Sequence, residues 1–144
     1  VDQANNDGFT PLLMAVLGGH LEVVTAPVDA TATVDLANND GGTPLFLACQ
    51  LGRVDVARIL IERGADIEAS LRGNGWTPLF VAAWAGNRSV IDGDVATEAR
   101  LHEIRRMLVK KGANLRAETT AEHQGVPAGS TPLSVAAEVG DTAP

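Results

Sequence analysis

Cysteine occurs only once in the 144-residue chain, as Cys49. An intrachain disulfide is therefore excluded, and a lone cysteine between apolar neighbours is typical of a reducing compartment and of a small core residue. The sequence also lacks an apolar run long enough to span a membrane, and its first residues do not form a signal peptide. These absences predict an intracellular protein, cytoplasmic by default, with an organelle as the alternative.

Basic residues are scarce. Eleven Lys and Arg stand against eighteen Asp and Glu, which gives a formal charge of −7, and none of the basic residues precedes Arg53. A net acidic chain repels phosphate backbones, so nucleic acid is not an expected partner. Six basic residues crowd the segment from Arg100 to Arg116. We interpret this cluster as the solvated face of a helix, with a partner surface as the alternative.

A Thr-Pro-Leu motif recurs four times, at residues 10–12, 43–45, 77–79 and 131–133. Its threonines are 33, 34 and 54 residues apart, and an alanine follows each threonine by five positions. Glycine-containing runs such as Asn6-Asp7-Gly8 precede the motif, and these residue types favour a tight turn. The pattern predicts a repeated unit that begins with a turn and continues into a helix.

The residue types of the repeat suit two short helices. Threonine can cap a helix by accepting a backbone N–H, and proline fits the first helical position, where its missing N–H costs nothing. The small alanine lets the two helices of a unit lie close together. Gly19, Gly52 and Gly86 are expected to end the first helix of each unit, and Gly64 and Gly112 the second, in a left-handed conformation.

A period near 33 residues with Thr-Pro-Leu and then alanine is the ankyrin signature. The second unit completes it with Ala48, Gly52, Val56, Leu60 and the run Gly64-Ala65-Asp66. The chain therefore resembles the ankyrin repeat family over nearly its whole length. The resemblance implies an all-α solenoid of helix-turn-helix units joined by short β-hairpin-like loops. It implies one domain over residues 1–144, with units at about 6–38, 39–73 and 74–128 and a partial unit at 129–144.

Stacking of the units must supply the stability, because a helix of ten residues is marginal alone. We expect a set of apolar residues of the second unit to pack on a matching set of the third. The first set is Leu45, Leu47, Val56, Ile59 and Leu60, and the second is Leu79, Val81, Ile104 and Leu108.

The sequence departs from the repeat pattern in three places. Pro27 falls inside the expected second helix of the first unit, residues 21–30, which we therefore expect to be short or kinked. The third unit is longer by some twenty residues, with inserts at about 87–99 and 114–129. We predict that residues 87–97 project as a loop between two helices and that residues 115–128 form a long finger on the hairpin side. The chain also stops soon after a fourth unit begins, which suggests a fragment or a subunit sheltered by neighbours.

No arrangement of residues typical of catalysis or metal binding is present. His20, His102 and His123 lack metal-ligand spacing, and Cys49 has no partner thiol. The acidic run at residues 92–94 lacks the other ligands of a calcium loop. No phosphate-binding loop or nucleophile motif occurs. We predict a chain without enzymatic activity, metal or cofactor.

The five aromatic residues all lie near a Thr-Pro-Leu motif. By resemblance to the family, the residues before each threonine, after each leucine and further along the first helix face a partner. Large apolar residues at such places mark interaction sites, and Trp76 and Trp84 are expected to be largely exposed there. Phe46 and Phe80 have an alternative role as space-filling residues. The predicted partner-binding residues are Phe9, Leu13, Phe46, Gln50, Trp76, Phe80 and Trp84.

The leading hypothesis is a non-catalytic protein-binding scaffold that uses a concave, aromatic-lined surface to hold another protein. A structural subunit of a large complex is one alternative. The interaction domain of a larger enzyme, whose catalytic part lies elsewhere, is another.

Overall fold

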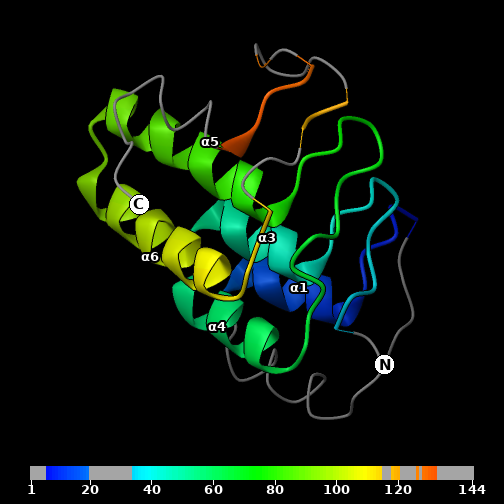
Figure 1. Ribbon diagram of the computed structural model, residues 1–144. Helices are drawn as coiled ribbons and strands as arrows, with labels where there is room; N and C mark the ends of the chain where they lie inside the picture. The colour runs from blue at the N-terminus through cyan, green and yellow to red at the C-terminus, as the bar shows by residue number, and fades with distance from the viewer. Residues whose placement is uncertain (1–5, 20–33, 115–117, 121–125, 127, 133–144) are drawn as a thin grey trace.

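The computed structural model describes residues 6–19, 34–114, 118–120, 126 and 128–132. Five helices lie in these residues, arranged in two rows (Figure 1). The first row consists of α1 (Pro11–Gly18), α3 (Pro44–Leu51) and α5 (Pro78–Asp92), which pack side by side. The second row consists of α4 (Val54–Glu62), packed on α3, and α6 (Val95–Lys110), packed on α5. The described residues contain no extended strand. The predicted all-α architecture is therefore confirmed.

The three threonine caps start their helices in the same way. Thr10, Thr43 and Thr77 each accept a hydrogen bond at Oγ1 from the backbone N–H three residues later, at 3.2 Å in every case. Proline occupies the first helical position after each cap. At the fourth motif Pro132 is helical, and the residues that follow it lie outside the described part of the chain. The predicted helix starts at the first three threonines are confirmed.

Glycines end four of the helices. Gly19 and Gly52 adopt left-handed conformations, with φ of 72° and 70°, at the ends of α1 and α3. After α4, the Gly64 N–H donates to the Ile61 carbonyl at 3.1 Å and the Ala65 N–H donates to the Leu60 carbonyl at 3.0 Å. The same pair of bonds follows α6 at residues 112 and 113. These are Schellman caps, which use the left-handed glycine to satisfy the last carbonyls of a helix.

The extra residues of the third unit lengthen its helices. Helix α5 has 15 residues where α3 has 8, and α6 has 16 where α4 has 9. Each helix is seven residues longer, which is nearly two turns at 3.6 residues per turn, so the same faces continue to meet. Leu101, in the added part of α6, is fully buried. The expected loop at residues 87–97 is therefore wrong, and Gly86 lies inside α5.

The physical reason is that the added segment contains no proline and extends both members of an antiparallel pair. Every added turn keeps its own backbone hydrogen bonds and can pack on the other helix. The chain reverses at Gly93, where φ is 76°. The α5–α6 pair extends beyond the shorter helices of the second unit by roughly 10 Å, at 1.5 Å per residue (Figure 1).

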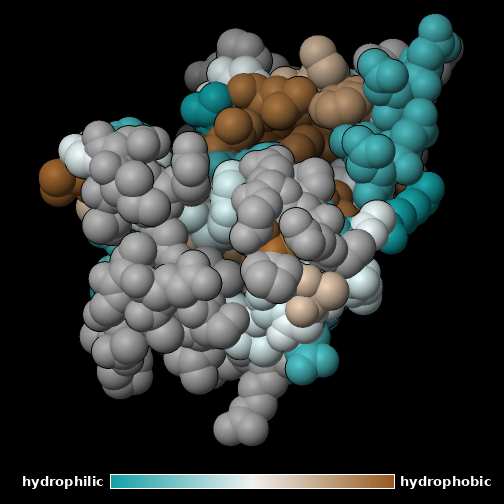
Figure 2. Space-filling view, turned by 90° about the horizontal axis from the view of Figure 1, so that it is seen from above, coloured by the Kyte–Doolittle hydropathy of each residue, from teal (hydrophilic) through white to brown (hydrophobic). Residues whose placement is uncertain are grey.

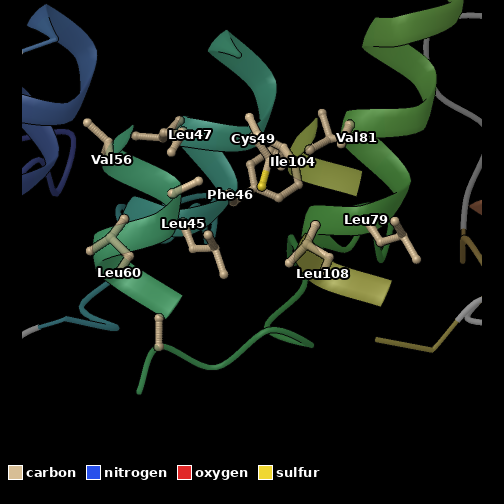
Figure 3. Packing of buried hydrophobic residues seen from close by; sticks show 14 of the residues in the cluster. Leu45, Phe46, Leu47, Cys49, Val56, Leu60, Leu79, Val81, Ile104 and Leu108 are labelled. Atoms are coloured by element: carbon tan, nitrogen blue, oxygen red, sulfur yellow. The ribbon is translucent and has the colours of Figure 1, made fainter. Parts of the chain in front are cut away.

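The core lies between the two rows. Eight of the nine apolar residues predicted to meet belong to one buried cluster (Figure 3). The exception is Ile59, which is partly buried and lies outside the cluster. Leu45 and Leu60 come from the second unit and Leu79 and Leu108 from the third, and none of the four is more than 2% exposed. Stacking therefore buries what a single unit would leave exposed.

Two predictions fall on residues that the structure does not describe. Pro27 and the expected helix at residues 21–30 lie outside the described residues, as do His20 and His123. The finger at residues 115–128 is described in part. Its base is closed, because the Thr119 N–H donates to the Ser130 carbonyl at 2.9 Å and the Gly129 N–H donates to the Thr119 carbonyl at 2.7 Å.

Candidate interaction surface on the inner helices

The equal caps place equivalent residues of α1, α3 and α5 in rows across the inner face of the stack. Counted from the cap, the seventh residue is Leu17, Gln50 or Trp84, and the eighth residue of α3 is Leu51. Met14 lies one turn before Leu17 on α1, because residues three apart share a helix face. We call Met14, Leu17, Gln50, Leu51 and Trp84 the inner strip.

The inner strip is apolar and open to solvent. Met14 is 52% exposed and Leu51 is 39% exposed, while Gln50 is exposed and Leu17 and Trp84 are partly so. Separately, the face of the molecule seen from above carries a patch of hydrophobic surface next to hydrophilic surface (Figure 2). Neighbouring large apolar side chains that remain exposed mark a surface suited to contact with a partner.

Four of the seven predicted binding residues are core residues instead. Leu13, Phe46, Trp76 and Phe80 are each at most 3% exposed. Phe46 and Phe80 thus take the space-filling role that was their alternative interpretation. Phe9 is partly buried against the core, which leaves Gln50 and Trp84 as predicted residues within the inner strip.

The expected exposure of Trp76 is wrong, because its ring stacks beneath α5. The ring centroids of Trp76 and Phe80 lie 4.9 Å apart, and those of Trp76 and Trp84 lie 5.3 Å apart, both pairs tilted. Phe80 and Trp84 are four residues apart and share one face of α5, and the Trp76 ring, which precedes the helix, contacts both. We call these three rings the aromatic column. Tilted aromatic pairs at these distances are favourable beyond the area they bury. Trp84 is the member of the column that remains partly exposed.

Sequence reasoning missed Met14 and Leu51. Leu51 directly follows the predicted Gln50, and Met14 lies one turn before Leu17, the residue of α1 that is equivalent to Gln50. The prediction instead followed the aromatic residues. Aromatic residues are as well suited to a core as to an interface.

Loops project to one side of the inner helices (Figure 1). We call them fingers, at residues 6–9, 34–42 and 65–76, with a fourth of which residues 113–114, 118–120, 126 and 128–130 are described. Backbone hydrogen bonds join each finger to the next. The N–H groups of Asn39, Arg72 and Thr120 donate to carbonyls of Asp7, Asp40 and Asn74, at 3.1, 3.0 and 2.7 Å. The fingers therefore form a continuous edge in fixed register with the helices.

Acidic side chains also fix the fingers to the next unit. An Asp35 carboxylate oxygen accepts the Asp66 N–H at 2.9 Å, and Glu68, 33 positions later, accepts the Asn114 N–H at 2.7 Å. A hollow of about 330 Å³ lies beside Glu68 and is lined by polar residues of the last two fingers: Glu68, Ser70, Gly75, Thr77, Asn114, Glu118 and Thr120. Because Glu68 already accepts a backbone hydrogen bond, its first role is structural.

Two arginines connect neighbouring helices. Arg53 donates from Nε to the Val16 carbonyl at 3.1 Å and from Nη2 to the Leu17 carbonyl at 2.8 Å. Arg105 donates from Nη1 to the Ala82 carbonyl at 3.3 Å and from Nη2 to Glu98 at 3.0 Å. Both guanidinium groups thus serve the packing of the stack.

Within the described part of the chain, the remaining titratable groups show no arrangement typical of catalysis. Burial raises the pKa of the Cys49 thiol far above its usual range, which keeps it protonated and unreactive. Asp94, from the acidic run, caps α6 by accepting the Thr97 N–H at 3.1 Å. His102 Nδ1 lies 3.3 Å from Arg105 Nη2. Among the described residues, no group of three His, Cys, Asp or Glu could hold a metal ion.

No helix within the described part of the chain is both long enough and apolar enough to cross a membrane. A family model described as ankyrin repeats, in three copies, matches residues 1–71 and, overlapping these, residues 33–92. The two matches together cover well over half of the chain. No curated protein matches it.

Proposed function

Because the chain belongs to the ankyrin repeat family, whose repeats are generally protein-interaction modules, we propose that it is a scaffold that binds another protein through the inner strip. The exposure of two large apolar side chains, Met14 on α1 and Leu51 on the adjacent α3, carries the proposal. Full burial of a fully exposed Met or Leu side chain contributes about 1.5–3 kcal/mol, so covering the part of Met14 or Leu51 that is still exposed contributes roughly half of that. A partner that covers both would gain affinity without any change in the fold.

The arrangement of the strip supports binding by a preformed surface. Its residues lie on helices whose starts are fixed by threonine caps and whose opposite faces are buried in the core. Side chains held on rigid elements lose less conformational freedom on binding than side chains on loops. Trp84, supported by the ring of Trp76, is the large aromatic residue at the end of the strip.

The test compares proteins captured by immobilised chains. The test variant is Met14→Ser with Leu51→Ser, which removes the two exposed apolar side chains. The matched control is Leu36→Ser with Val109→Ser, because these residues are similarly exposed, at 41% and 45%, but lie on a finger and on α6. Mass spectrometry should find a partner retained by the wild type and by the control and lost from the test variant.

The same partners retained by all three chains would contradict the proposal, provided that circular dichroism shows both variants folded. Truncation of Trp84 is a poorer test, because that ring also packs against Trp76. A loss of binding by Trp84→Ala would not separate a lost contact from a disturbed core.

A further inference from the structure

The carbonyls that join the fingers all belong to one kind of dipeptide. Each lies on an aspartate or asparagine that a glycine with positive φ follows: Asp7-Gly8, Asp40-Gly41 and Asn74-Gly75, with φ of 82°, 86° and 72° at the glycines. Asn74-Gly75 is the only Asn-Gly pair in the chain. The joint between the third and fourth fingers therefore contains a side-chain amide directly before an unhindered backbone N–H.

Asparagine before glycine is chemically labile. The Gly75 nitrogen can attack Cγ of Asn74, which forms a C–N bond and closes a succinimide ring, and the side-chain nitrogen leaves as ammonia with the proton of the Gly75 N–H. Glycine favours this step because it has no Cβ to hinder the approach. Water then breaks one of the two ring C–N bonds, which restores the N–H and leaves aspartate or isoaspartate at position 74. The aspartates of the other two joints cyclise more slowly, because an ionised carboxylate resists attack.

The folded third finger holds this pair away from cyclisation. Asn74 is only 6% exposed, and its Oδ1 accepts the Trp76 N–H at 3.0 Å. The Gly75 N–H donates to the Leu71 carbonyl at 3.1 Å. The Thr120 side chain lies against Gly75, since a Cβ built there would be 3.0 Å from Thr120 Cγ2. These bonds must break before the nitrogen can lose its proton and reach Cγ, so the finger has to open first.

We infer that Asn74 is a modification site that deamidates when the joint between the third and fourth fingers opens. Opening breaks the bond from the Thr120 N–H to the Asn74 carbonyl, at 2.7 Å, and leaves the helices packed. The fourth finger is held at its base by Thr119, whose N–H donates to the Ser130 carbonyl at 2.9 Å and whose Oγ1 accepts the Ser130 N–H at 3.1 Å. The strength of this base therefore controls the rate of modification.

The modification acts on the aromatic column. Asn74 holds the backbone of Trp76, and the Trp76 ring contacts the Trp84 ring, with the centroids 5.3 Å apart. Either product places a carboxylate where a neutral amide is now nearly buried, and burying a charge costs more than burying an amide. Isoaspartate also takes the joint carbonyl out of the main chain, so the Thr120 N–H loses its present acceptor. Both products thus weaken the support of Trp84 at the end of the inner strip.

The test follows the whole chain in buffer at pH 8 and, separately, in urea that unfolds it. Peptide mass spectrometry measures deamidation at Asn74 from the mass difference between an amide and a carboxyl group. Asn38 is the matched internal control, because it is 7% exposed and accepts the N–H two residues later, that of Asp40, at 3.0 Å, but Asn39 follows it in place of glycine. We expect Asn74 to react many-fold faster in urea than in buffer, and Asn38 to react slowly in both.

Variants locate the opening. Thr119→Ala removes the hydroxyl that accepts the Ser130 N–H and should speed deamidation of the native chain severalfold. Thr120→Ala removes the exposed side chain that lies against Gly75 and should act in the same direction. The control Arg53→Ala weakens the stack at α1, away from this joint, and should change the rate less than about twofold.

Tryptophan emission reports the effect on the aromatic column, because Trp76 and Trp84 are the only two tryptophans in the chain. The emission should change in proportion to the deamidated fraction. The variant Asn74→Ser keeps an oxygen acceptor but has no amide to lose, so its emission should stay constant during the same incubation.

Three results would overturn the inference. The first is an equal rate at Asn74 in buffer and in urea, because the fold would then not protect the pair. The second is a threonine variant rate no higher than that of Arg53→Ala, because the opening would then not be local to this joint. The third is unchanged emission from the deamidated chain. No partner enters these measurements, so they are independent of the proposed function, which the serine variants of the inner strip test.

Discussion

The Arg53 guanidinium occupies the space beside the backbone of Gly19. A Cβ built at Gly19 would lie 2.9 Å from Nη1 and 3.0 Å from Cζ of Arg53. From this position the guanidinium donates to two carbonyls in the last turn of α1, those of Val16 and Leu17. The Val16 carbonyl also accepts the Gly19 N–H at 3.2 Å. A residue of the second unit thus completes a helix of the first, and the bare backbone of Gly19 makes the approach possible.

Replacing Arg53 with alanine should destabilise the stack by about 2 kcal/mol, because hydrogen bonds from a charged group to partly buried carbonyls are lost. Urea unfolding followed by circular dichroism measures the change. The control is Arg58→Ala on α4, whose side chain is 47% exposed and pairs with an exposed Asp55. Such surface pairs contribute roughly 0.5 kcal/mol or less. Equal losses in the two variants would show that Arg53 does not cap α1.

Gly86 and Arg105 should be coupled in stability. Glycine inside a helix costs about 1 kcal/mol relative to alanine, so Gly86→Ala by itself should stabilise α5. However, a Cβ on Gly86 would overlap Nη1 of Arg105 and displace its hydrogen bond to Ala82. We therefore expect Gly86→Ala to be more stabilising, by about 1 kcal/mol, when it is made in the Arg105→Ala variant than when it is made in the wild type. A double-mutant cycle by urea unfolding measures this coupling, and strictly additive effects would refute it.

Asp94 should make the stability of α6 dependent on pH. Hydrogen bonds from Thr97, through its side chain and its N–H, and the charge of Arg100 lower the pKa of this carboxyl. Because the folded-state pKa is lowered, the ionised Asp94 carboxylate stabilises the fold above the unfolded-state pKa of about 3.9. This stabilisation is lost as the pH falls through the folded-state pKa.

The variant Asp94→Asn retains a side-chain acceptor for the cap but cannot titrate. Below about pH 4, the stability of this variant should fall less steeply with decreasing pH than the stability of the wild type. Thermal melts between pH 2 and pH 7 measure the difference. The control Asp55→Asn removes a carboxyl in the first turn of α4 that is not its cap. The prediction fails if Asp94→Asn and the wild type lose stability in parallel.

Cys49 should be inert toward thiol reagents in the native state. It is fully buried, and burial raises the pKa of its thiol, so both access and thiolate are lacking. Ellman's reagent at pH 8 should therefore react many-fold faster in denaturing urea than in buffer. Rapid reaction of the native chain, at a rate independent of urea, would contradict the burial of Cys49.

The fold could be predicted from the sequence because its signals are local. A threonine cap, a proline after it and a glycine at the helix end each act within one turn, and they appear at a constant spacing. The long helices of the third unit were missed for the same reason. Gly86 carries the same local signal as Gly52, but the helix continues through it. At Gly86 the missing Cβ leaves the space that the Arg105 guanidinium occupies, a contact between helices that the local sequence does not reveal.

The binding surface was harder to predict than the fold. Whether Trp76 faces solvent depends on its stacking with Phe80 and Trp84, and nothing within its own turn reveals that contact. Hydrophobicity alone does not separate a buried Leu13 from an exposed Met14 in the same helix. Whether a side chain faces the core or the solvent depends on its direction about the helix axis. That direction can be assigned only once the residue that caps the helix is known.

Each finger is joined to the next by at least one bond between backbone atoms, from the N–H groups of Asn39, Arg72 and Thr120 to carbonyls of the preceding finger. Replacing a tip side chain that makes no bond to a neighbouring finger therefore leaves the backbone bonds of the edge in place, provided that the glycine turn beside it is kept. The tips can change one at a time during evolution while the scaffold persists. Such a surface can be retargeted to a new partner by point mutation, and the same freedom is open to directed evolution of its fingers.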